Sequence, residues 1–127
     1  MDRILVSRLF EFINPFERLG VPQNLPLVGE LQTEFKEDDI ETRDASYAPA
    51  RIRYFVDQIN KGAKLGPLCI DNVCGGGNIY PEPVLLDGHH RFAAAILTST
   101  KHLMCEYGGR MDLLRYLQGR RLTAPQE

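Results

Sequence analysis

The stretch Val84–Ala95, which reads Val-Leu-Leu-Asp-Gly-His-His-Arg-Phe-Ala-Ala-Ala, decides the fold of this chain of 127 residues. Its apolar beginning, Pro83–Leu86, predicts a buried strand. The residues after the glycine, up to about Thr98, have apolar side chains at helical spacing, so we expect a helix with Phe92, Ala95 and Ile96 facing inward. A strand that runs directly into a helix is typical of an α/β domain.

The rest of the chain alternates between strand and helix signals around this stretch. Apolar residues at positions 52, 55, 56 and 59 share one face of a helix that we expect over Pro49–Lys61, with Ser46 as its cap. Further strands are expected at Ile4–Val6, Leu68–Ile70 and Leu103–Tyr107, and a last helix around Leu113, Leu114 and Leu117. We therefore expect one α/β domain over residues 1–122, with a mixed sheet, flanking helices and a loose tail at 123–127.

The composition is that of an ordinary globular protein, with 43% hydrophobic and 25% charged residues. The net charge of -2 argues mildly against a dedicated nonspecific nucleic-acid binder. Three cysteines cannot all pair within one chain, which favours a reducing compartment. With neither a secretion leader nor an apolar run of spanning length, we expect a cytoplasmic protein with no membrane partner.

The turn between the strand and the helix has the features of a phosphate site. The first amides of a helix lack internal partners, and the helix dipole favours negative charge there. Gly88 has no Cβ, so a ligand can approach the backbone closely. Arg91 offers two parallel donors to phosphate oxygens, and His89 and His90 add donors that protonate near neutral pH. These residues together predict an anion site.

A purely structural interpretation of the same turn is open. Asp87 can cap the helix without any ligand, and Arg91 can form an ion pair with an acid of the Glu34–Asp44 stretch. Positive charge near a helix N-terminus is unfavourable, however, by up to about 1 kcal/mol per group unless an anion compensates. Because three such residues stand together here, we favour the functional interpretation.

The stretch from Val84 to Ala95 resembles the D-G-x-H-R-x-x-A-A signature of the ParB/sulfiredoxin superfamily. The order of expected elements over residues 47–108 is also similar, which implies a single small ParB N-terminal-like (sulfiredoxin-like) domain. Sulfiredoxins carry a catalytic cysteine where this chain has His89, so sulfiredoxin activity is not expected. Partition proteins have a Gly-Glu-Arg-Arg box and further DNA-binding regions, and we do not expect a complete protein of that kind.

The motif is most similar to that of free-serine kinases of the superfamily. This resemblance implies binding of ATP or another NTP with Mg²⁺, for phosphoryl transfer or hydrolysis. Gly88, His89 and His90 would hold the phosphates, Arg91 would neutralise their charge, His90 and Asp87 would be catalytic, and Asp87 would contact the metal. A general base is also needed, and the sequence leaves a choice among Glu30, Glu34, Glu37, Asp38 and Asp39.

Other interpretations stay open. A DNA-binding or nuclease module is supported only by a locally basic C-terminal region, with Arg110, Arg115, Arg120 and Arg121. A catalytically idle regulatory or inhibitory protein of plasmid or phage origin would instead have a protein partner. Cys69 and Cys74 could join His89 or His90 in a zinc site, although a fourth ligand is missing. Arg51 and Arg53 either reach the ligand or, more commonly for helical arginines, face solvent.

Overall fold

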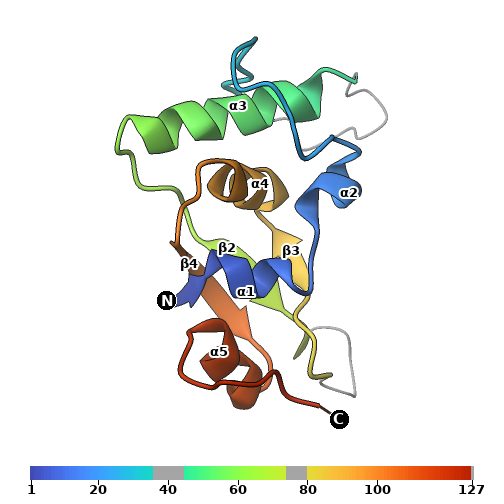
Figure 1. Cartoon of the computed structure of the whole chain (residues 1–127), viewed down its shortest axis with the longest axis vertical. Helices are drawn as coiled ribbons and strands as arrows, with labels where there is room; N and C mark the ends of the chain where they lie inside the picture. The colour runs from blue at the N-terminus through green and yellow to red at the C-terminus, as the bar shows by residue number, and fades with distance from the viewer. Residues whose placement is uncertain (36–44, 74–79, 127) are drawn as a thin grey trace.

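A computed structural model of the chain describes residues 1–35, 45–73 and 80–126. Figure 1 shows the arrangement of its helices and strands. In chain order they are β1 (Asp2–Leu5), α1 (Val6–Phe10), α2 (Pro15–Leu19), α3 (Tyr47–Asn60), β2 (Leu68–Asp71), β3 (Leu85–Asp87), α4 (His89–Leu97), β4 (His102–Gly108) and α5 (Met111–Leu117). No helix within these residues is long and apolar enough to cross a membrane.

The four strands form one mixed sheet in the order β1-β4-β2-β3. Strand β4 runs antiparallel to β1 and parallel to β2, and β3 runs antiparallel to β2. The register places Leu68 opposite Cys105 and Cys69 opposite Asp87. The prediction of an α/β domain with a mixed sheet and flanking helices is therefore confirmed at this level.

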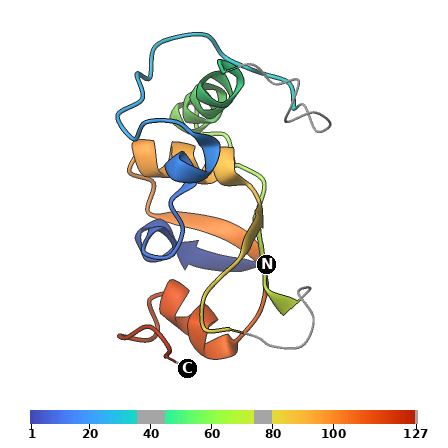
Figure 2. The same ribbon diagram turned by 90° about the vertical axis from the view of Figure 1, so that its right-hand side faces the viewer.

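Helix α4 lies between two hydrophobic clusters. On one side, Phe92 and Ala95 join a cluster formed by the buried face of the sheet and by residues of α1 and α5. On the other side, Ala93 and Ala94 pack with residues of α2 and α3, among them Ile52. Figures 1 and 2 show the resulting stack, with α3 above α4 and the sheet below it. Of the three residues predicted to face inward, Phe92 and Ala95 are fully buried, whereas Ile96 is partly buried against both clusters. Ala93 and Ala94 are fully buried as well.

Two strands differ from the sequence prediction. The strand expected at Pro83–Leu86 is β3, a three-residue strand that includes Asp87. It is not a buried strand, because it lies at the edge of the sheet and leaves Leu86 52% exposed. At the other edge, β1 ends one residue earlier than predicted, since Val6 already begins α1.

Helix α2 was not predicted, although its sequence carries helix signals. Asn14 caps it, its side-chain oxygen accepting from the amides of Phe16 (3.0 Å) and Glu17 (3.3 Å). Pro15 occupies the first turn, where a missing amide hydrogen does no harm. Gly20 ends the helix in the left-handed conformation, with φ of 66°. The buried Phe16 ring anchors this short helix in the cluster shared with α3 and α4.

Candidate functional site

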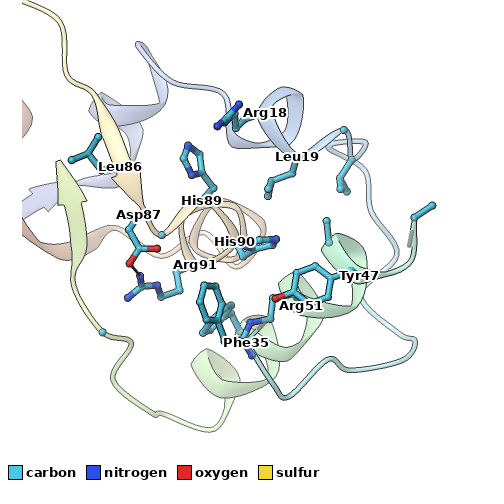
Figure 3. Close-up of a pocket in the computed structure, with 17 residues that line it drawn as sticks. Arg18, Leu19, Phe35, Tyr47, Arg51, Leu86, Asp87, His89, His90 and Arg91 are labelled. Atoms are coloured by element: carbon cyan, nitrogen blue, oxygen red, sulfur yellow. Dashed lines mark hydrogen bonds and ion pairs between the residues drawn. The ribbon is translucent and has the colours of Figure 1, made fainter. Parts of the chain in front are cut away.

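A pocket of about 790 Å³ opens where the N-terminus of α4 meets α2 and α3. Figure 3 shows its lining residues, which include all five residues of the Asp87–Arg91 motif. Helix α2 contributes Arg18, and α3 contributes Tyr47 and Arg51. Small-molecule sites in proteins typically enclose roughly 300–1,000 Å³. The predicted turn therefore lies in a pocket large enough for a ligand of nucleotide size.

Gly88, not Asp87, occupies the N-cap position of α4. Its φ of 105° lies in the region that favours glycine, and an added Cβ would lie 2.5 Å from Leu68 Cδ2. Asp87 does not cap the helix because it ends the preceding strand, where its backbone pairs with Cys69. The first intrahelical bond runs from the Phe92 amide to the Gly88 carbonyl (2.8 Å), so the amides before Phe92 have no acceptor within the helix.

The sequence predicted that the motif lies at the carboxyl edge of the sheet, and this prediction is wrong for the sheet as a whole. Strand β3 is antiparallel to β2, so its end lies beside the beginning of β2. The loop that enters β2 consequently contacts the motif, and Gly66 of that loop lines the pocket. This reversal decides which backbone groups surround the motif.

Arg91 joins three parts of the chain. Its Nη2 donates to Asp87 Oδ2 (3.0 Å), and its Nη1 donates to the Pro67 carbonyl oxygen (2.9 Å). The Arg91 side chain is 16% exposed and that of Asp87 is 67% exposed. Within the described residues Arg91 pairs with Asp87, and positions 36–44 of the Glu34–Asp44 stretch considered above lie outside them. An arginine has five N–H donors, so these two bonds leave three for a ligand.

His89 lies beside Arg18 (Figure 3), a pocket residue that was not predicted from the sequence. Burial lowers the pKa of His89, the nearby charge of Arg18 lowers it further, and Asp87 acts in the opposite direction. The imidazole is consequently held neutral near physiological pH. His90 turns the other way and meets Tyr47 edge to face, with ring centroids 5.7 Å apart. The two histidines thus face opposite walls of the pocket.

Arg51 is a buried arginine in the pocket wall, with only 9% of its surface exposed. Its Nη1 donates to the Gln32 carbonyl oxygen (3.1 Å), and its guanidinium lies over the Phe55 ring at 4.5 Å. Its Nε is buried and finds no acceptor among the residues that the structure describes. Arg53, by contrast, donates to the Pro26 carbonyl (2.8 Å) and does not line the pocket. Of the two arginines left open by the sequence, Arg51 is the one that reaches the site.

The candidate bases are not brought to the pocket within the described ranges. Glu37, Asp38 and Asp39 lie outside the described residues, and the exposed Glu30 and Glu34 do not line the pocket. Asp87 is the only carboxylate in the described lining.

The described residues contain no cluster of three or more metal-ligating side chains. For the zinc hypothesis, Cys74 lies outside the described residues, and Cys69 on β2 does not line the pocket. A magnesium ion needs fewer protein ligands, because it binds through one or two carboxylates together with substrate phosphates. The exposed carboxylate of Asp87 fits that limited role.

Comparisons with known protein families, curated proteins and solved structures found no match to this chain. The resemblance to the ParB/sulfiredoxin superfamily thus rests on the motif and the order of elements, and it stays a hypothesis.

Proposed function

We propose that this pocket binds a nucleoside phosphate, ATP or another NTP accompanied by Mg²⁺, for phosphoryl transfer or hydrolysis of the ParB/sulfiredoxin-like kind. The observation that carries the proposal is Arg51. A guanidinium that is nine-tenths buried, with an N–H group lacking an acceptor in the described chain, is costly unless an anion binds it. This guanidinium lines the same pocket as the first turn of α4, whose amides have no acceptor within the helix.

The charge balance of the pocket supports an anionic ligand. Three arginines, Arg18, Arg51 and Arg91, line it against the single described carboxylate of Asp87. The dipole of α4 adds partial positive charge at the same place. Electrostatic attraction is stronger in a partly buried pocket than in bulk water. A phosphate group at the start of α4 would thus meet amide donors and guanidinium groups together.

Each motif residue has a role in this proposal that follows from its contacts. The amides of His89 and His90 would donate to phosphate oxygens, and Arg91 would use its remaining N–H groups to neutralise charge. Asp87 would provide a carboxylate oxygen to Mg²⁺, which neutralises and orients the phosphates when bound. His90 remains the predicted proton-transfer residue. Its contact with Tyr47 fixes the orientation of its ring.

The proposal is tested by calorimetric titration with ATP, CTP, GTP and ADP, each with Mg²⁺. The wild type should bind at least one of them, and Arg51→Gln should weaken that binding at least about tenfold through loss of a charged contact. Arg53→Gln, from the same helix but outside the pocket, is the matched control. Arg91→Lys would add evidence, but its role in joining Asp87 to Pro67 requires a folding check by thermal melting. Absence of binding by every nucleotide would disprove the proposal.

The nucleic-acid alternative gains no support from the C-terminal arginines. Arg110 and Arg121 both pair with Asp112, at 2.7 Å and 3.4 Å, so one carboxylate neutralises part of the charge of this region. A regulatory role with a protein partner stays a prediction. It would be favoured if the titrations showed no nucleotide binding while the chain remained folded.

A further inference from the structure

The positive groups of the pocket stand on two sides of the start of α4. Figure 3 shows Arg18 beside His89 on one side, with Arg91 and Arg51 on the other and His90 between them. Arg18 forms no ion pair with any residue in the described ranges. Its charge nevertheless acts on His89, because it disfavours protonation of that ring.

Helix α2 fixes the backbone position of Arg18, whose side chain is exposed. The helix is capped by Asn14 at one end and closed by Gly20 at the other, where the Val21 amide donates to the Phe16 carbonyl (2.9 Å). The Phe16 ring is buried against α4 and α3. Arg18 is therefore carried on an anchored element and not on a loose loop, which indicates that its position beside the pocket is part of the fold.

Two other neighbouring arginines share a carboxylate. Arg110 and Arg121 both pair with Asp112, which neutralises part of their charge. In the pocket, the one described carboxylate lies on the Arg91 side, where it binds Arg91 directly. The Arg18 side has no carboxylate among the described lining residues. A second phosphate group on the ligand would supply negative charge to that side.

We infer that the ligand carries a chain of at least two phosphates, and that Arg18 binds one end of the chain while Arg91 and Arg51 bind the other. This inference rests on the proposed function and deepens it, because it makes Arg18 the residue that selects for phosphate chain length. The base of a nucleotide is not needed for this selection. Tripolyphosphate and a nucleoside triphosphate share the chemistry that the two sides recognise.

The test compares the affinity of AMP, ADP, ATP, pyrophosphate and tripolyphosphate, each with Mg²⁺, for the wild type, Arg18→Gln and the exposed control Arg115→Gln. In the wild type, the affinity should rise about tenfold from AMP to ADP or ATP, as one added charge-assisted contact allows. Arg18→Gln should remove this rise and leave the affinity for AMP unchanged, whereas Arg115→Gln should behave as the wild type. Melting curves show whether each variant is folded.

The possible results separate this inference from the proposed function. Equal binding of AMP and ATP by the wild type would overturn the inference and leave the phosphate site standing, and so would an equal loss for all ligands in Arg18→Gln. If tripolyphosphate binds as tightly as ATP, the inference is supported and the row of linked phosphates is the group that the pocket recognises. If no phosphate compound binds the wild type, the proposed function fails and the inference fails with it.

Discussion

Arg8 and Arg51 both lie over an aromatic ring and donate to a backbone carbonyl, but only Arg51 keeps a buried N–H group without an acceptor in the described chain. At the end of the molecule formed by α1 and α5, Arg8 lies over the Tyr116 ring at 4.1 Å and donates to the Tyr116 carbonyl (2.9 Å) and to that of Arg121. At the other end, the group without an acceptor is the Nε–H of Arg51. We infer that the contacts of Arg8 stabilise the fold, whereas Arg51 retains a positively charged donor that an anionic ligand can bind.

The largest effect on stability is expected from Gly88→Ala, which would disturb the turn at the start of α4 in the pocket. The added methyl would overlap Leu68 Cδ2, 2.5 Å away, and would also strain a φ of 105°. Strain and overpacking together predict a loss of about 3 kcal/mol in the free energy of unfolding. Chemical denaturation measures it. Gly62→Ala is the control, because φ there is 78° with nothing within 4 Å, and a loss equal to that of Gly88→Ala would contradict the role of Leu68.

An intermediate effect is expected when methionine replaces an arginine at each end. Arg8→Met removes two hydrogen bonds and a cation–π contact, so it should lower the free energy of unfolding by about 1–2 kcal/mol. Arg51→Met removes the hydrogen bond to Gln32 and the contact with the Phe55 ring, but it also removes a buried charge with an N–H group that lacks an acceptor in the described chain. These effects oppose one another, so the free energy of unfolding should change by less than about 1 kcal/mol or increase. Chemical denaturation of the two variants under the same conditions measures both changes in the free energy of unfolding. A larger loss for Arg51→Met would show that Arg51 is primarily structural.

The smallest effect concerns the pH dependence of ligand binding. Burial and the Arg18 charge lower the pKa of His89, so the folded chain is penalised as the pH falls through the ordinary value of 6.5 toward the lowered one. A phosphate beside His89 would raise this pKa again. Binding should therefore tighten a few-fold between about pH 8 and about pH 5.5 relative to His89→Gln.

Calorimetry at both pH values measures this proton linkage. The His89→Gln variant corrects for protonation of the ligand itself, because both proteins meet the same phosphate. Identical pH profiles for the two proteins would place the phosphate away from His89.

Regular apolar spacing made much of the fold predictable. The helix expected at Pro49–Lys61 is α3, which begins at Tyr47, and the strands expected at Leu68–Ile70 and Leu103–Tyr107 are β2 and β4. The short helices α1 and α2 were missed because five residues are too few to establish a period. The cap Asn14 and the stop at Gly20 were the available signals for α2, and they indicate a helix only when considered together.

The candidate site was predictable only where it is continuous in sequence. The Asp87–Arg91 motif lies in one turn, so local spacing found it. Arg51 was left open because its burial depends on the contact with Gln32, which lies 19 residues away. Arg18 reaches the pocket only through the packing of α2 on α4, which no local pattern reveals. Long-range packing thus places two of the three pocket arginines, Arg18 and Arg51, in the site.

The burial of α4 on both sides has a consequence for the cost of ligand binding. The donor amides stand at the end of a helix whose residues Phe92 to Ala95 are fully enclosed by two clusters. Local opening of this helix would disrupt both clusters at once, so its hydrogen-bonded amides from Phe92 onward should be among the slowest in the chain to exchange with solvent. The ligand then meets donors that are already fixed in place, and little conformational entropy is lost when it binds.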